Sequence, residues 1–187
     1  SKVENTITVT AKWKPKRYTI NYNNNGGDGC TTKNADYGTP WGKLCEPTRE
    51  GYSFVKWTND TGTVTKDTIC YGSIDVLANW SINSYTLTYN DNGGANCAGK
   101  SITKEYNKAW GTLCTPTRTG YDFKGWYLDS TQVTNTSLAK ATIEVKAKWT
   151  ANKYTLTYDD NTGSGCSDES VKAAYGGSWG KLCTPKK

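Results

Sequence analysis

The sequence contains no histidine and no methionine, and it has only two phenylalanines among 187 residues. Without histidine, the chain lacks the side chain that most often serves as a general base and as a zinc ligand near neutral pH. A zinc site made of cysteine alone needs paired C-x2-C knuckles, and the seven cysteines are spaced too widely to form them. These absences argue against histidine-based catalysis and against the common zinc sites.

Long apolar runs and clustered positive charge are also missing. No apolar stretch approaches the roughly 20 residues that a membrane-spanning helix needs, so we expect no direct membrane insertion in this segment. The net charge of +6 is spread along the chain, and no basic cluster is longer than residues 12–17. Because nucleic-acid-binding proteins usually concentrate their charge on one element, we expect no nucleic-acid partner, whereas attraction to acidic cell-surface polymers stays open.

Aromatic and small polar residues are abundant instead, with 13 tyrosines and eight tryptophans. Aromatic residues and threonine favour strands, and asparagine favours turns. Widely spaced cysteines in such a chain are typical of disulfide-bonded proteins, which fold in oxidising compartments. The composition therefore predicts a mainly β protein in an extracellular or cell-surface location.

The sequence repeats itself with a period of 67 to 69 residues. The three openings are YTINYNNNGGDGC, YTLTYNDNGGANC and YTLTYDDNTGSGC, and each complete copy closes on a phrase such as IEVKAKW. This period predicts a closing strand with its junction, two full repeats, and the first half of a further repeat. The corresponding residues are 1–17, 18–84, 85–153 and 154–187.

Alternation with period two predicts strands with one buried face inside each repeat. Residues 143–149 alternate apolar and charged side chains, and residues 74–80 and 7–13 repeat that closing pattern. Residues 85–89 form an opening strand, and residues 102–106 return beside it, so a hairpin is expected around the Asn/Gly turn.

Six of the seven cysteines occupy equivalent places in the copies. Pairing each within its own copy is the only scheme that satisfies every copy identically, and it predicts disulfides Cys30–Cys45, Cys97–Cys114 and Cys166–Cys183. Closing a loop of that size is worth about 3 kcal/mol, which matters because a repeat of about 68 residues is small for a self-sufficient core. The remaining Cys70 is expected to be either a buried free thiol or an intermolecular bridge.

The junctions between copies are short, and helical signal is poor. Four residues span at most about 14 Å, so neighbouring repeats are expected to touch and to form a semi-rigid rod. The best helical stretch, residues 134–141, would give one or two turns.

Several separated phrases together resemble the internalin B-repeat, also called the Listeria–Bacteroides repeat. They are YTLTYNDNGG (85–94), PTRTGYDFKGWY (116–127) and the closing AKW (147–149). The resemblance implies small, β-grasp-like α+β modules in tandem on secreted or surface-anchored proteins, where they serve as stalks and interaction segments without enzyme activity. The two cysteines per copy depart from the typical pattern, as does FVKWTND (54–60) in the first copy.

Two features invite a ligand-binding interpretation. The loop YNDNGGANC (89–97) offers oxygen ligands, but it lacks the EF-hand spacing, and its Asn/Gly core favours a turn over a calcium site. One recurrent aromatic precedes a glycine in every copy and could either stack on a sugar or fill the core beside the disulfide; its members are Trp41, Trp110 and Trp179. The other tryptophans are expected in the core: Trp13, Trp57, Trp80, Trp126 and Trp149.

We therefore expect a non-enzymatic structural or adhesive segment, namely a stalk, an adhesin or a filament, with no catalytic residues, metal or cofactor. One alternative is a carbohydrate-binding module that uses the recurrent tryptophans. Another is a fibre subunit, in which residues 6–13 of one molecule complete residues 154–187 of the next by strand donation. The expected partners are other copies or repeats of the protein, or a host or neighbouring-cell surface protein or glycan.

Overall fold

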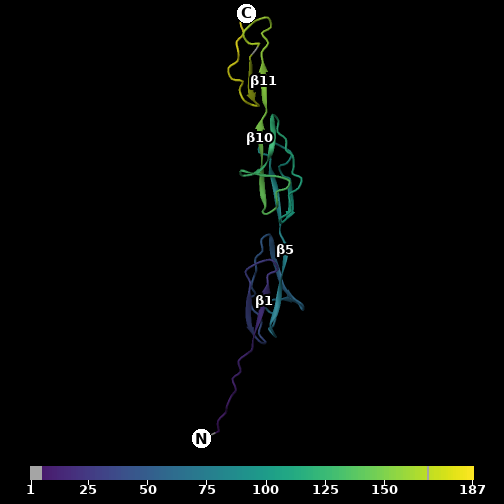
Figure 1. The fold of residues 1–187 in the computed structure, drawn as a ribbon, viewed down its shortest axis with the longest axis vertical. Coiled ribbons are helices and arrows are strands. Elements are labelled where there is room, and N and C mark those ends of the chain that lie inside the picture. Colours follow the sequence, from purple (N-terminus) through teal and green to yellow (C-terminus); the bar gives the residue numbers. More distant parts are fainter. Residues whose placement is uncertain (1–5, 168) are drawn as a thin grey trace. The chain divides into compact units, whose positions relative to one another are not determined.

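A computed structural model describes residues 6–167 and 169–187 of the chain (Figure 1). Its internal contacts divide it into two compact units, Ser1–Asn83 (unit 1) and Ser84–Lys187 (unit 2). The described residues form strands, turns and bends without a helix, which confirms the mainly β class. The helical turns expected at residues 134–141 are absent; Thr134 follows a short strand, and the segment continues through turns.

Unit 1 contains one five-stranded mixed sheet with the order β2-β1-β5-β3-β4. Its strands are β1 (Arg17–Asn23), β2 (Thr32–Asp36), β3 (Tyr52–Asn59), β4 (Gly62–Val64) and β5 (Ile74–Ile82). β1 and β2 form the expected hairpin, and β1 runs parallel to β5 at the centre of the sheet. The opening and closing phrases of one copy are therefore neighbours in space.

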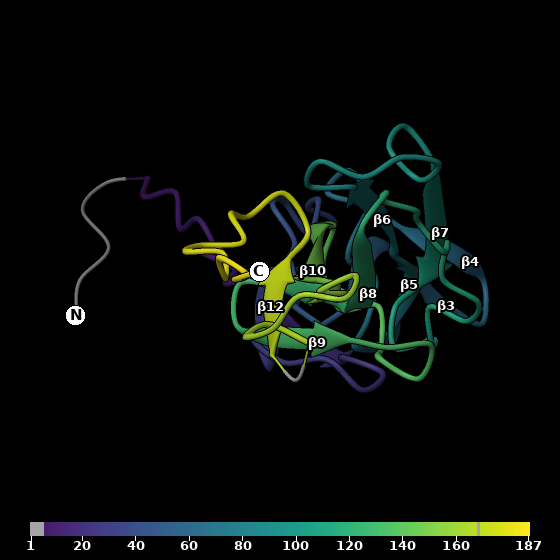
Figure 2. The ribbon, with the colours of Figure 1, turned by 90° about the horizontal axis from the view of Figure 1, so that it is seen from above.

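Unit 2 repeats this sheet with the order β7-β6-β10-β8-β9. All five strands are labelled in Figure 2. Its strands are β6 (Ser84–Asn90), β7 (Ser101–Glu105), β8 (Tyr121–Leu128), β9 (Thr131–Val133) and β10 (Ile143–Ala151). A separate two-stranded hairpin follows, formed by β11 (Lys153–Thr157) and β12 (Ser170–Ala174). A single residue, Asn152, separates β10 from β11, so this junction is shorter than the four residues expected.

One face of each five-stranded sheet is buried, as the alternation predicts. In unit 2 the core contains Leu87, Tyr89, Trp126 and Val145, and unit 1 has an equivalent cluster. Trp80 and Trp149 pack partly buried against these clusters. β-Grasp modules would add a helix against this face, whereas here the loop that carries the second cysteine of each pair packs there, with Leu113 and Cys114 against the core of unit 2.

The strand expected at residues 7–13 is not formed. Residues 6–16 have no secondary structure, and Ile7, Val9 and Trp13 are 80%, 86% and 91% exposed. A strand needs a neighbour for its backbone hydrogen bonds, and no described strand pairs with this segment. The prediction that Trp13 lies in a core is therefore wrong, and residues 1–5 of the same predicted segment lie outside the described residues.

Candidate functional site

The connection between β6 and β7 begins with a turn whose residues are set by backbone geometry. Asn92 and Gly93 have φ angles of 48° and 84°, a region that asparagine and glycine tolerate best. The Asn92 side-chain amide donates a hydrogen bond to the Ala147 carbonyl on β10, at 3.0 Å. The turn is thereby fixed against the closing strand of the same sheet.

The second glycine of the N-G-G phrase is required by close packing. A Cβ atom on Gly94 would lie 2.5 Å from Cζ2 of Trp149 and 2.8 Å from the Thr117 carbonyl oxygen. The indole nitrogen of Trp149 donates to the Asp91 carbonyl at 2.9 Å, which holds the ring over the turn. The opening turn and the closing Trp149 therefore pack directly against each other.

Three disulfides follow these turns, and they join the cysteines at equivalent places of the copies. The Cα atoms of each pair are 5.8 to 5.9 Å apart, a normal separation for a disulfide. The sequence separation is 15 residues in unit 1 and 17 in both bridges of unit 2. The bridges are Cys30–Cys45, Cys97–Cys114 and Cys166–Cys183.

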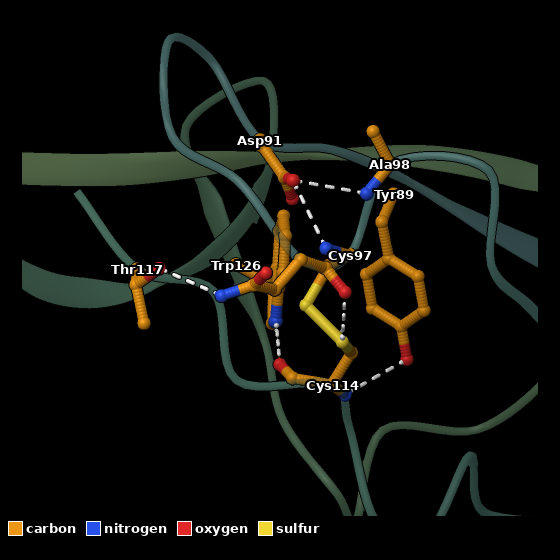
Figure 3. The surroundings of a disulfide bond; sticks show 8 residues. Tyr89, Asp91, Cys97, Ala98, Cys114, Thr117 and Trp126 are labelled. Atoms are coloured by element: carbon orange, nitrogen blue, oxygen red, sulfur yellow. Dashed lines mark hydrogen bonds between the residues drawn. A yellow bond between two sulfur atoms is a disulfide. The ribbon is translucent and has the colours of Figure 1, made fainter.

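Two aromatic side chains hold the peptide groups of the second cysteine (Figure 3). In unit 2 the Cys114 N–H donates to the Tyr89 hydroxyl at 3.2 Å, and the Trp126 indole N–H donates to the Cys114 carbonyl at 2.7 Å. In unit 1, Tyr22 and Trp57 make the same contacts with Cys45, at 3.4 and 2.8 Å. Core strands and covalent bridge are thus connected through buried polar atoms; we call this arrangement the aromatic clamp.

Burial affects the tyrosine of the clamp. Tyr22 is only 9% exposed, and desolvation raises the pKa of its hydroxyl, while the hydrogen bond from the Cys45 N–H opposes that rise. The neutral phenol is therefore the form that the fold stabilises. The indole rings of the clamp, Trp57 and Trp126, are each 2% exposed, as expected of core residues.

In unit 2, a carboxylate binds the backbone at the first cysteine of the disulfide. Asp91 is 5% exposed, and its Oδ2 accepts hydrogen bonds from the Cys97 and Ala98 N–H groups at 3.0 and 2.9 Å (Figure 3). Its Oδ1 has no hydrogen-bond partner among the described residues. Among those residues no group of three or more potential metal-ligating side chains is found, and the loop's own backbone binds one of the two carboxylate oxygens.

Unit 1 places an amide at the same position with the opposite polarity. Asn24 Nδ2 donates to the Cys30 carbonyl at 2.9 Å. One residue separates Cys30 from β2, whereas three separate Cys97 from β7, and these two extra residues account for the longer disulfide loop. The longer connection in unit 2 presents backbone N–H groups to Asp91, whereas the shorter one in unit 1 presents a carbonyl to Asn24. An acceptor side chain therefore fits the longer loop, and a donor side chain fits the shorter one.

The β11–β12 hairpin follows the longer pattern. Asp160 accepts from the Ser167 hydroxyl at 2.7 Å and from the N–H groups of Cys166 and Ser167 at 3.0 and 2.9 Å. The Ser167 hydroxyl, followed by the Cys166 N–H, lowers the pKa of the Asp160 carboxyl. The charged carboxylate is thus the form that this loop binds.

The recurrent tryptophans do not share one environment. Trp41 and Trp110 are each 2% exposed and lie in the cores of their sheets, so they offer no ring face to a sugar. Trp179, in the segment after β12, is 36% exposed. A shared aromatic surface from these three positions is therefore not formed in the described units.

Cys70 is buried and has no disulfide partner. Its thiol lies 3.7 Å from the Ala35 carbonyl, which it can reach as a weak hydrogen-bond donor. Ala139 is its equivalent in unit 2, and both residues are 0% exposed. The position accepts a small apolar side chain, and this geometry gives the thiol no route to a second molecule.

Within unit 2, the β11–β12 hairpin is joined to the preceding sheet at one place. The Asn152 N–H donates to the Gly120 carbonyl at 2.9 Å, and the Tyr175 N–H donates to the Asn152 carbonyl at 2.8 Å. The Tyr175 ring packs edge-on against Tyr121, with centroids 5.8 Å apart, and a Cβ atom on Gly120 would overlap it. We call these residues the joint.

Sequence reasoning identified the cysteines and the turn, but it missed the clamp tyrosines, the loop carboxylate and the joint. The recurrence of Tyr22, Tyr89 and Tyr158 at one position was a visible signal, since a buried tyrosine usually needs a partner for its hydroxyl. The Cys183 N–H donates to Tyr158 at 3.1 Å, so the third copy keeps this contact too.

Comparisons with known proteins agree with the internal repeat. The family model described as the Listeria-Bacteroides repeat domain matches residues 18–78 and again 85–150. Two proteins of Evansella cellulosilytica, named as a membrane protein and as a glycine-rich membrane protein, are 31% and 30% identical over 83% and 93% of this chain. Internalin H of Listeria monocytogenes is 34% identical over 43% of it.

The chain spans 24%, 21% and 15% of the length of these three relatives. No solved structure matches the chain. No helix long and apolar enough to cross a membrane occurs in residues 6–167 and 169–187. With both five-stranded sheets covered by the family model, the chain belongs to the Listeria-Bacteroides repeat domain family.

Proposed function

We propose that this chain is a non-enzymatic structural segment of an extracellular or cell-surface protein, in which disulfide-linked repeats act as a stalk that holds other parts away from the cell. The observation that carries this proposal is the aromatic clamp around each disulfide. In both five-stranded sheets the clamp binds the N–H and carbonyl groups of one cysteine to tyrosine and tryptophan of the core. Such a module resists extension through covalent and buried polar contacts together.

The joint supports a semi-rigid connection between successive modules. Only Asn152 lies between β10 and β11, and both of its peptide groups are hydrogen-bonded. The contact of Tyr175 with Tyr121 and Gly120 leaves little room for bending there. A one-residue connection with paired backbone groups favours a spacer over freely moving beads.

The disulfides support an oxidising, exported location. The Cys30–Cys45, Cys97–Cys114 and Cys166–Cys183 bridges would be rare in a protein kept in a reducing cytosol. The relatives named as membrane proteins and as internalin H are consistent with the cell surface. Adhesion to a host or neighbouring-cell protein or glycan would be a further role of the same stalk.

Surface display is the test of location. Antibodies against unit 2 should label intact producing cells as strongly as permeabilised ones, and non-reducing peptide mapping of the native protein should recover the three bridges. Labelling only after permeabilisation, together with reduced cysteines, would refute an extracellular stalk. Brief protease treatment of intact cells is the control for accessibility. It should remove the labelling equally from cells that stay intact and from cells that are permeabilised afterwards.

We also propose that each module is a helix-free variant of the β-grasp arrangement. The central parallel pairing of β1 with β5, and of β6 with β10, supports this comparison. The disulfide-linked loop occupies the side of the sheet where a helix would pack. Backbone chemical shifts test the point: helical shifts across residues 37–51 or 106–120 would contradict the variant.

A further inference from the structure

A groove about 610 Å³ in volume lies over the solvent face of the sheet in unit 2. It is lined by side chains of β8 and β10 together with the β8–β9 turn and the N-G-G turn. Its charged strand residues Glu144, Lys146 and Lys148 alternate with the core residues of β10, although Ala147 and Trp149 of the core also border it. The proposed stalk function makes no use of the groove. Its lining includes three cations, two carboxylates and three aromatic rings.

The strand register explains why the charges gather there. Lys146 pairs with Tyr127 across the β8–β10 ladder, and Lys148 lies two residues further along the same face. The Lys148 ammonium is 4.8 Å from the centroid of the Tyr127 ring, a cation–π distance. Such contact restricts a side chain that would otherwise move freely, so a fixed positive charge faces the groove.

A second cation is held at the end of the groove. The Arg118 guanidinium lies 3.9 Å from the centroid of the Tyr121 ring, and it donates to the Asn92 carbonyl at 3.2 Å. A guanidinium has five N–H donors, and those that do not bind the Asn92 carbonyl can bind an anion in the groove. Positive charge is thus present at two places along one hollow.

Acidic side chains in the same lining decide which anion fits. Asp129 and Glu144 are exposed carboxylates within the groove, and they would repel a dense polyanion such as nucleic acid or a polyacidic peptide. Carboxylates accept hydrogen bonds from hydroxyl groups equally well. A polymer that carries one acidic group per sugar, with hydroxyl groups between the acidic groups, matches both sets of side chains.

Unit 1 keeps the arginine, since Arg49 stacks on Tyr52 and donates to the Asn25 carbonyl, but it lacks the other two cations. Thr58, Leu77 and Asn79 stand where unit 2 has Tyr127, Lys146 and Lys148, and Asn79 Nδ2 donates to the Thr58 hydroxyl at 2.8 Å. The hollow on that face is smaller, about 340 Å³, and its charged lining residues are Asp60 and Asp75. The lining of the groove in unit 2 thus has more cations than carboxylates, whereas the smaller hollow in unit 1 is lined by carboxylates without a cation.

We propose that the groove of unit 2 binds an acidic polysaccharide, with Arg118, Lys146 and Lys148 facing its carboxylates and with Asp129 and Glu144 accepting from its hydroxyl groups. This site is distinct from the recurrent tryptophans, two of which are buried. It also stands apart from the stalk function, since a spacer needs no groove. Association is expected to weaken as ionic strength rises, because exposed charges are screened beyond about 10 Å at 0.1 M salt.

Calorimetry with the full chain and polygalacturonate oligomers tests the proposal. A variant that introduces the unit 1 residues (Tyr127→Thr, Lys146→Leu, Lys148→Asn) should bind about tenfold more weakly or worse, since it removes two cations and the ring that holds one of them. Its melting temperature is measured beside the wild type to show that the fold is kept. The reciprocal variant, Thr58→Tyr, Leu77→Lys, Asn79→Lys, should add a second site per chain.

Two further probes decide the chemical class. Fully methyl-esterified polygalacturonate should not bind, and poly-glutamate should bind at least about tenfold more weakly than polygalacturonate because of the groove carboxylates. Equal binding of the ester would overturn the role of charge, and stronger binding of poly-glutamate would indicate an acidic protein partner instead. Absence of polygalacturonate binding, or binding unchanged in the folded triple variant, would overturn the site.

Discussion

One backbone position illustrates how a single residue depends on the loop that it faces. Asn24 in unit 1 donates to a carbonyl, whereas Asp91 in unit 2 accepts from two N–H groups. The two side chains have nearly the same shape, so their identity is decided by hydrogen-bond polarity. The difference follows from the two additional residues between Cys97 and β7.

Exchange of the two residues should therefore be asymmetric. Asn24→Asp places a carboxylate against the Cys30 carbonyl and removes the amide N–H that binds it, which should cost about 1–3 kcal/mol of unfolding free energy in unit 1. Asp91→Asn should cost less, about 1 kcal/mol, because its amide oxygen can still accept both N–H groups. Urea titrations of the two variants measure the difference, and equal losses would contradict the polarity argument.

Ser167 should control the acid titration of the third copy. Its hydroxyl is the main cause of the lowered pKa of Asp160, so Ser167→Ala should move that pKa back toward the ordinary value of 3.8. Because the folded-state pKa is depressed, the stabilisation is present above the unfolded-state value and is lost as the pH falls through the folded-state value. Carboxyl-carbon NMR titration of Asp160 measures the shift.

An unchanged midpoint of Asp160 would show that the Cys166 and Ser167 N–H groups alone account for its acidity.

At the scale of elements, the turn and the closing strand form one packed structure. Gly27 in unit 1 has no space for a side chain, because a Cβ atom would lie 2.5 Å from the Thr48 carbonyl oxygen and 2.6 Å from the Trp80 ring. Position 27 therefore requires glycine because of Trp80, which lies more than 50 residues later on β5.

Substitution of this glycine should destabilise unit 1 through overpacking. Gly27→Ala should lower the unfolding free energy by about 1–3 kcal/mol. Gly72→Ala is the matched control, since its Cβ would meet no atom within 4 Å and its φ is not positive; it should be neutral or stabilising by up to about 1 kcal/mol. Thermal unfolding of both variants measures the contrast, and similar losses would argue against the contact with Trp80.

The elements themselves were largely predictable from the sequence, because alternation marks strands that bury one face. Residues 143–149 and 85–89 lie within β10 and β6. Residues 7–13 carry the same alternation, but alternation describes a side-chain pattern and does not supply a neighbouring strand. The loop carboxylate and the groove depend on register and on loop length, so Asp91 and Lys148 gave no local signal of their roles.

At the scale of the whole molecule, the joint determines how firmly one module continues into the next within unit 2. Tyr175 contacts Tyr121 and also Tyr154 at 6.4 Å, and it covers Gly120. The joint uses tyrosine and backbone groups, so it needs no long linker. A stiff spacer requires such contacts at its connections.

Tyr175→Ala should loosen the β11–β12 hairpin. An aromatic pair contributes about 0.5–1.5 kcal/mol, so amide hydrogen exchange of Ser170–Ala174 should become up to about tenfold faster. Trp13→Ala is the control, because Trp13 is 91% exposed and its loss should leave exchange in β12 unchanged. Unchanged exchange in Tyr175→Ala would mean that the hairpin is held by its own strands alone.

The central claim is that each module resists extension through its disulfide and clamp, and single-molecule stretching of the full chain tests it most directly. With the bridges intact, the 15 to 17 residues between paired cysteines cannot extend when a module unfolds. After reduction, each five-stranded module should lengthen by about 50 Å more on unfolding, at about 3.5 Å per released residue, and should unfold at a lower force. Equal lengths and equal forces before and after reduction would contradict the account.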